Sequence, residues 1–385
     1  MIINIFLFLS LIFLLTFLLG RFIEKIHVPW IFASLLIGLI LSIYNPFNSL
    51  TSSNIFNFLA QLGMYFLLFI IGFEIDLKKL KKGSKFILKG TLFIIFIETI
   101  FGGLFIYFIF KYDLILSLII ALSFATVGEA ILIPILDEFK LINSKLGQAI
   151  IGIGTLDDII EIFALILVVF LIGSKTYSNL NITLILLSLF ILFVLTFGLT
   201  KLKEEGIKFK FHSIETLFLF TIFILFLFLG IGEYAEATAL ASLLAGIALK
   251  TFIPEKRLKL IENETKTICY GFFAPIFFLW IGAMMNLNYL ISYPLLILLM
   301  VLITGGAKFL GSYIISYKEL GKRNSILFGL GLCVRFSTCM VIIKILLDSK
   351  LIDINLYSII IASTIVFTFL VPILFSNLLT KWNIK

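Results

Sequence analysis

Two adjacent carboxylates, Asp157 and Asp158, lie near the middle of an apolar run that extends from about Ala149 to Gly173. A helix rises about 1.5 Å per residue, so this run is long enough to cross ~30 Å of hydrocarbon with both carboxylates inside it. A carboxylate at that depth costs at least ~2.5–3.5 kcal/mol, and intramembrane acids therefore tend to face a cavity, a partner or a transported ion. The pair is the candidate centre for binding a cation or a proton.

The two carboxylates are about 100° apart around one helix, so they cannot both point at the same partner. One is expected to face a cavity and the other a neighbouring helix. Glu161 follows within one turn on a similar face, where it either supports the pair or is buried in its protonated form. Glu129 follows an interrupted run and is placed to begin a helix, where a carboxylate is favoured. Glu98 also lies inside an apolar run, and we rank it below these acids.

Two basic side chains, Lys308 and Arg335, also fall inside apolar runs. A buried lysine alone tends to lose its proton and a buried acid alone tends to gain one, so pairing across helices is the cheaper arrangement. Lys308 lies far enough from the end of its run that snorkelling to the interface is the less favoured explanation. Because a guanidinium stays protonated, Arg335 is expected to be structural, whereas Lys308 can take part in a proton cycle.

Hydroxyl-bearing and small residues interrupt two further apolar runs, at Ser123–Glu129 and at Cys333–Thr338. Such residues let a helix unwind, and the freed carbonyls and helix ends can then line an ion path. For either run alone, hydroxyls that bond back to their own helix are the favoured explanation. The two runs occupy equivalent positions in the repeat described below, which reverses that preference. We therefore expect Thr126, Ser337 and Thr338 at the rim of the ion site.

The composition is that of an integral membrane protein, with 61% hydrophobic and 14% charged residues, where soluble domains carry about 25% charged residues. We count about 13 apolar spans. Of the 30 Lys and Arg residues, 24 lie in alternate linkers and 3 in the linkers between them. The positive-inside rule makes the basic side cytoplasmic, with the N-terminus outside and the C-terminus inside. Topology thus explains the net charge of +8, and nucleic acid is not an expected partner.

The second half of the chain repeats the first. Ala33–Leu41 and Ala241–Leu249 share six of nine residues at an offset of 208, and Phe69–Leu77 aligns with Leu279–Leu287 at an offset of 210. Because the second copy begins seven spans later, the two copies have opposite orientations, as in secondary transporters with ion sites at the midplane. We expect one transmembrane domain over residues 1–385, with repeat one at about 1–175, a linking span at about 180–200 and repeat two at about 212–385.

At these residues the chain resembles the prokaryotic monovalent cation/proton antiporters of the NapA and NhaA type, with Kef-like proteins as relatives. The resemblance covers essentially the whole chain and is carried by six segments in the family's order: Gly72–Lys78, Ala125–Gly128, Leu156–Asp158, Phe278–Gly282, Ala307–Gly311 and the segment ending at Arg335. It implies an all-α membrane protein with the NhaA-like antiporter fold. That fold has about 13 transmembrane helices, an inverted repeat of spans 1–6 and 8–13 with two broken crossing helices, and forms a homodimer.

The resemblance also implies roles for the charged residues. Asp158 alternates between a proton and the cation, while Asp157 pairs with Lys308 and is released when the cation binds, so both aspartates are expected as Na⁺ ligands. Related sequences with Asn before the second Asp resemble electroneutral exchangers, which favours an electrogenic one here. Phe336 and Ser337 stand where many relatives carry Gly-Glu, so the partner of Arg335 is expected elsewhere, at Glu161 or Glu129.

The expected function is exchange of Na⁺ or Li⁺ for H⁺ across the plasma membrane, with a role in pH homeostasis, no cofactor and no enzymatic activity. The nearer alternative is a K⁺/H⁺ antiporter or Kef-like potassium efflux protein, disfavoured because no nucleotide-binding segment follows Lys385. The distant alternative is an intramembrane aspartyl protease. Such an enzyme needs two acids that share a proton, and adjacent residues of one helix do not converge in that way.

Overall fold

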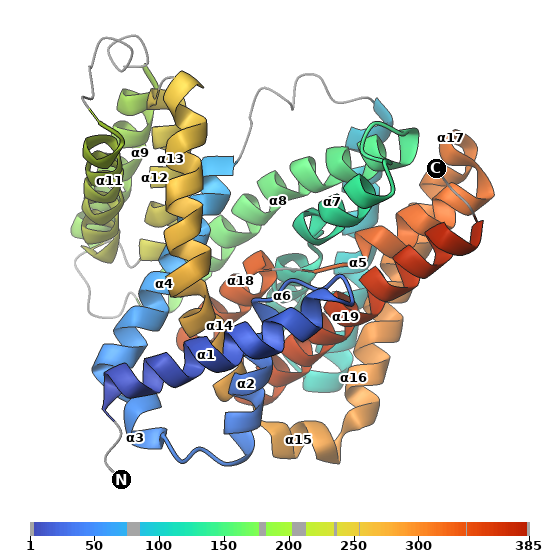
Figure 1. Ribbon diagram of the computed structural model, residues 1–385, viewed down its shortest axis with the longest axis horizontal. Helices are drawn as coiled ribbons and strands as arrows, with labels where there is room; N and C mark the ends of the chain where they lie inside the picture. Colours follow the sequence, from blue (N-terminus) through green and yellow to red (C-terminus); the bar gives the residue numbers. More distant parts are fainter. Residues whose placement is uncertain are drawn as a thin grey trace. The chain divides into compact units, whose positions relative to one another are not determined.

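The computed structural model describes residues 4–74, 85–176, 182–201, 213–234, 237–253, 255–335 and 337–382, and every regular element in these ranges is a helix (Figure 1). Among the described residues, 7 helices are long and apolar enough to cross a membrane, by length and composition. Four shorter apolar helices accompany them: Phe32–Ile43, Leu114–Phe124, Leu187–Leu199 and Thr238–Phe252. The predicted all-α membrane class is therefore confirmed for this part of the chain.

The helices of the first half of the chain are α1 (Ile5–Glu24), α2 (Phe32–Ile43), α3 (Asn48–Thr51), α4 (Asn54–Glu74), α5 (Lys85–Phe110), α6 (Leu114–Phe124), α7 (Glu129–Glu138), α8 (Lys145–Thr176) and α9 (Ile182–Lys201). Helices are expected here because hydrocarbon offers no hydrogen bonds, so a spanning segment has to satisfy its backbone internally.

The helices of the second half are α11 (Ile214–Tyr234), α12 (Thr238–Phe252), α13 (Glu255–Ile268), α14 (Ala274–Ala283), α15 (Leu287–Ser292), α16 (Pro294–Met300), α17 (Gly306–Leu332), α18 (Ser337–Asp348) and α19 (Ile354–Trp382). Two π-helical turns, η2 (Cys269–Phe273) and η3 (Val301–Gly305), join α13 to α14 and α16 to α17. Within α17, Gly321 has a φ of 74°, a left-handed conformation that favours glycine, and the helix kinks there.

Both predicted helix interruptions are confirmed. α6 ends at Phe124 and α7 begins at Glu129, while α17 ends at Leu332 and α18 begins at Ser337. The two interruptions touch, because the N–H of Gly128 donates to the carbonyl oxygen of Val334 at 2.8 Å. Backbone groups that left their own helices are thus bonded to one another, which removes part of the cost of unwinding inside a membrane.

The chain divides into two compact units, each built from separate segments. Unit 1 comprises Met1–Ser10, Phe47–Ile75 and Ile166–Trp280, and unit 2 comprises Leu11–Pro46, Asp76–Leu165 and Ile281–Lys385. Each unit therefore combines segments from both predicted repeats. Within unit 2, α5 packs against α6 and α17, and α18 packs against α6 and α19 (Figure 1). These five helices, together with α8, η3 and the two interruptions, hold the described residues of the candidate site.

Each unit contains a close glycine crossing that has a counterpart in the other unit. In unit 1, a Cβ added to Gly72 of α4 would lie 2.1 Å from the carbonyl oxygen of Leu243 in α12. In unit 2, a Cβ added to Gly282 of α14 would lie 2.2 Å from the carbonyl oxygen of Leu35 in α2. Gly282 follows Gly72 by 210 residues and Leu243 follows Leu35 by 208, the two offsets of the sequence repeat. The same contact is thus made twice, each time by one helix from each half.

Candidate ion site

One peptide group of the interrupted helix α6–α7 lies between two buried charges. The N–H of Val127 donates to Oδ2 of Asp157 in α8. The carbonyl oxygen of Thr126, in the same peptide group, accepts from Nζ of Lys308 in α17 at 2.5 Å. The peptide dipole is therefore aligned with its carbonyl toward the ammonium and its N–H toward the carboxylate, which is the favourable orientation at both ends.

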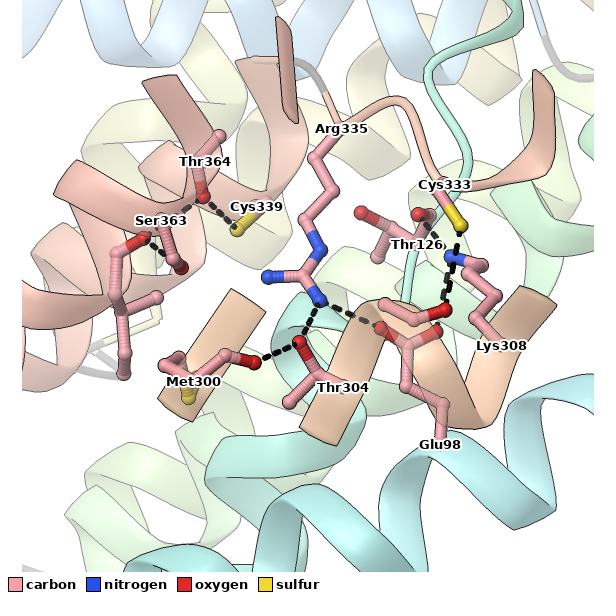
Figure 2. Close-up of polar contacts among 12 residues, drawn as sticks. Glu98, Thr126, Met300, Thr304, Lys308, Cys333, Arg335, Cys339, Ser363 and Thr364 are labelled. Carbon is pink, nitrogen blue, oxygen red and sulfur yellow. Dashed lines mark hydrogen bonds and ion pairs between the residues drawn. The ribbon is translucent and has the colours of Figure 1, made fainter. Parts of the chain in front are cut away.

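Glu98 of α5 joins Lys308 to Arg335. Its Oε2 lies 3.0 Å from Nζ of Lys308, and its Oε1 lies 2.7 Å from Nη2 of Arg335. All three side chains are buried, and Figure 2 shows the carboxylate between the two cations. Removing one member of such a buried group costs about 3–5 kcal/mol, because it leaves an uncompensated charge in a place that water does not reach.

Arg335 lies in the interruption between α17 and α18 and is covered on all sides. Its Nη2 also donates to Oγ1 of Thr304 at 2.7 Å, and its guanidinium lies 5.0 Å from the ring centre of Phe124 and 4.5 Å from that of Phe367. Its carbonyl oxygen accepts from Oγ1 of Thr368 at 2.9 Å. Aromatic faces stabilise a desolvated cation, so these contacts fix both the side chain and the backbone of the interruption.

Two of these groups lie on one helix face at the turn η3, because they are four residues apart. Thr304 lies inside η3 and Lys308 lies just after it, at the start of α17. The hydroxyl of Thr304 donates to the carbonyl oxygen of Met300 at 2.7 Å, which orients its lone pairs toward Arg335 (Figure 2). Single π-helical turns of this kind are frequent at functional sites, because they change which side chains share a face.

The structure brings together four of the residues that the sequence singled out: Asp157, Thr126, Lys308 and Arg335. Four others, Asp158, Glu161, Glu129 and Ser337, lie in or at the start of α8, α7 and α18, but their side chains are outside the described part of the chain. Thr338 lies in the first turn of α18 and is partly exposed. The part of these five residues in the site stays a prediction.

Glu98 has a more central place in the structure than its sequence position predicts. Arg335 was expected to pair with Glu161 or Glu129, and the carboxylate it contacts is that of Glu98. One sequence signal pointed to Glu98, since Lys308 follows it by 210 residues, the offset of the repeat. The predicted pairing of Lys308 with Asp157 stays a prediction, because the contacts described for Lys308 are those with Glu98 and Thr126.

Comparison with known proteins shows that this chain is similar to sodium/hydrogen exchangers. A family model described as "Sodium/hydrogen exchanger, transmembrane" matches residues 9–381. A Na⁺/H⁺ antiporter from Enterococcus hirae is 24% identical over 321 residues, which cover 82% of this chain and 82% of that protein. A probable Na⁺/H⁺ antiporter from Methanocaldococcus jannaschii is 29% identical over 316 residues, covering 80% of this chain and 78% of that protein.

The fold is also similar to that of a solved structure, the sodium proton antiporter MjNhaP1 from Methanocaldococcus jannaschii at pH 8. The TM-score is 0.65 at 20% sequence identity, and the similarity covers 98% of this chain and 96% of that one. At this identity the comparison shows a shared fold.

Proposed function

This chain belongs to the sodium/hydrogen exchanger family, and from that premise we propose that it exchanges Na⁺ or Li⁺ for H⁺ by competition at Asp158. Its relatives carry the name of Na⁺/H⁺ antiporters, which are transporters and not enzymes. The observation that carries the proposal is the buried cluster of Glu98, Lys308, Arg335 and Asp157 at an interrupted helix. Buried ionisable groups of this kind mark ion and proton paths in membrane proteins.

Competition at one carboxylate is sufficient to couple the two ions. A proton and a cation cannot occupy Asp158 together, and the empty, ionised carboxylate is the costly state to move through a bilayer. The loaded states therefore alternate between the two sides of the membrane, which exchanges one ion for the other. Asp157, Thr126, Ser337 and Thr338 are the further oxygen ligands proposed for Na⁺, which replaces its hydration shell with such oxygens. No cofactor is part of the proposal.

Lys308 is proposed to make the exchange electrogenic. A lysine that pairs with Asp157 in the cation-free state and is displaced by the cation can release its proton, whereas an arginine cannot. The exchange rate should therefore depend on an imposed membrane potential, and Lys308→Gln should remove that dependence. A voltage dependence that persists in Lys308→Gln would take Lys308 out of the cycle.

The finer architecture is proposed to be that of the antiporters the sequence resembles. It has 13 spans in one transmembrane domain, with spans 1–6 and 8–13 as inverted repeats, and forms a homodimer in the lipid bilayer of the plasma membrane. The two glycine crossings support the repeat, since each is the counterpart of the other at the offsets of the repeat, and the contact between the two interruptions supports it because it joins corresponding segments of the two halves. The basic linkers support an external N-terminus and a cytoplasmic C-terminus.

The direct test is proton movement in proteoliposomes after addition of Na⁺, Li⁺ or K⁺, followed by dequenching of a pH-sensitive dye. Movement with Na⁺ or Li⁺ and none with K⁺ is the expected result. Movement with K⁺ alone would favour the alternative of a K⁺/H⁺ antiporter or Kef-like efflux protein. Because the three cations differ in radius, their ranking also reports the size of the site.

A further inference from the structure

Glu98 lies at the centre of the buried charges, although the cycle proposed above gives it no role. Its side chain is fully buried in α5, and its two oxygens contact different cations, Lys308 at 3.0 Å and Arg335 at 2.7 Å. In Figure 2 the carboxylate bridges the two cations. The two cations converge on one carboxylate, so Glu98 is the negative charge that Lys308 and Arg335 share.

The charges of the cluster balance only when Glu98 is counted. Among the described residues, the cluster holds two anions, Glu98 and Asp157, and two cations, Lys308 and Arg335. Lys344 is buried as well, but it pairs with Asp348 within α18. The formal charges of these four described side chains thus sum to zero. Without Glu98 the cluster would carry one net positive charge, which opposes the binding of a cation nearby.

Glu98 also acts on Asp157 through a chain of contacts. The ammonium of Lys308 lies between the carboxylate of Glu98 and the carbonyl oxygen of Thr126, at 3.0 and 2.5 Å. The N–H of the same peptide group, from Val127, donates to Asp157. A displacement of the ammonium therefore moves the peptide that holds the Asp157 carboxylate. Glu98 holds that ammonium by a second contact.

We propose that Glu98 is a positioning residue for cation binding: it holds Lys308 against the Thr126–Val127 peptide, whose N–H donates to Asp157, and it supplies a negative charge that offsets the ammonium beside the cation site. The inference rests on the proposed function, because it concerns a cation bound at the two aspartates. If Glu98 only supports the fold, its substitution should change the yield of folded protein and the maximal rate. If Glu98 positions Lys308 for cation binding, its substitution should change the apparent KM for Na⁺.

The test measures Na⁺-driven proton movement by the full chain in proteoliposomes as a function of Na⁺ concentration. Glu98→Gln keeps the size of the side chain and removes its charge, so it should raise the apparent KM for Na⁺ about tenfold or more. The maximal rate per folded protein should change by less than about threefold. Glu98→Asp keeps the charge but shortens the side chain by one methylene group, which moves the carboxylate away from Lys308. Its apparent KM for Na⁺ should therefore lie between those of the wild type and Glu98→Gln.

A double variant separates charge balance from packing. Glu98→Gln combined with Lys308→Gln removes both members of the pair and leaves Arg335 balanced by Asp157. Its apparent KM for Na⁺ should lie below that of Glu98→Gln, because the second substitution removes the excess positive charge. If Glu98→Gln does not accumulate in folded form, Glu98→Asp carries the test. A raised KM at unchanged folded yield then supports the proposal, and an unchanged KM overturns it.

Two results of the main experiment would overturn the proposal: a wild-type KM in Glu98→Gln, or a double variant whose KM equals or exceeds that of Glu98→Gln. Asp158→Asn is measured in the same vesicles to separate the two levels of inference. If Asp158→Asn is inactive and Glu98→Gln behaves as the wild type, only the role of Glu98 is wrong. If Asp158→Asn still exchanges, the proposed function itself is wrong.

Discussion

Arg335 shows how a permanent charge is accommodated in an apolar interior. Two side-chain oxygens accept from its Nη2, one from Glu98 and one from Thr304, each at 2.7 Å. Its Nε and Nη1 make no hydrogen bond within the part of the chain that the structure describes, and the rings of Phe124 and Phe367 lie against the guanidinium. Because the guanidinium has so few hydrogen-bond acceptors, the loss of one should cost more stability than it would in a solvated site.

Thr304→Val tests this dependence. Valine has the same shape as threonine but cannot accept from Arg335, so the substitution should destabilise the protein by about 1–3 kcal/mol. Thr221→Val is the matched control, because Thr221 is equally buried and its hydroxyl donates to the carbonyl of Leu217 as that of Thr304 does to Met300. Thermal unfolding in detergent compares the two. Equal losses of stability would show that the contact with Arg335 contributes nothing.

The sequence identified most members of the cluster but not its centre. Asp157, Lys308 and Arg335 stand out because each is a charge in an apolar run with a recognisable motif. Glu98 is also such a charge, but its partners lie more than 200 residues further along the chain. Which faces of α5 and α17 meet depends on helix packing and on the wide turn η3. Neither can be derived from residue spacing within one helix.

At the scale of helices, the close crossings of α4 with α12 and of α14 with α2 depend on glycine. A Cβ at Gly72 or Gly282 would lie 2.1 or 2.2 Å from a backbone carbonyl oxygen, a contact that backbone atoms cannot avoid by changing a rotamer. The helix axes would have to move apart. Small residues at such crossings are what allow membrane helices to approach closely, since no hydrophobic force drives them together in lipid.

Gly72→Ala and Gly282→Ala should each destabilise the protein by about 1–3 kcal/mol through overpacking. Gly230→Ala is the control, because nothing lies within 4 Å of a Cβ added there. In a helix this control should be neutral or stabilising, by up to about 1 kcal/mol. Thermal midpoints in one detergent provide the comparison. If all three variants melt together, the crossings are looser than described.

The interruptions of two helices were predictable, and the turns between others were not. Ser123, Thr126 and Gly128 in one run, and Ser337 and Thr338 in the other, weaken the helix where the chain lies inside the membrane. The turns η2 and η3 each contain one glycine, Gly271 and Gly305, but single glycines also occur inside regular helices of this chain, such as Gly230 in α11, so composition does not single the turns out. They follow from the packing of neighbouring helices, which one chain's local sequence does not encode.

At the scale of the whole molecule, the distribution of basic residues predicts which loops face the cytoplasm. Lys140 follows α7 and Lys350 follows α18, and both are exposed with positive φ values of 58° and 55°. The first lies in a basic linker and the second in a linker with one basic residue, so they should lie on opposite sides of the membrane.

Single cysteines at these two positions test that topology. Lys140→Cys should react with an impermeant thiol reagent only from the cytoplasmic side, and Lys350→Cys only from outside. The native thiols of Cys269, Cys333 and Cys339 are buried, so we expect them not to react with the reagent. Labelling of both positions from one side would contradict the proposed orientation and the count of spans between them.

The central claim is that the proton and the cation compete for Asp158. Na⁺-induced proton movement in proteoliposomes that contain Asp158→Asn tests it most directly, with Asp137→Asn as control. Asp137 is an exposed residue of α7, away from the buried cluster. We expect no Na⁺-induced proton movement with Asp158→Asn and wild-type movement with Asp137→Asn, because an amide neither binds a proton in this range nor carries a charge for the cation. Exchange retained in Asp158→Asn would contradict the account.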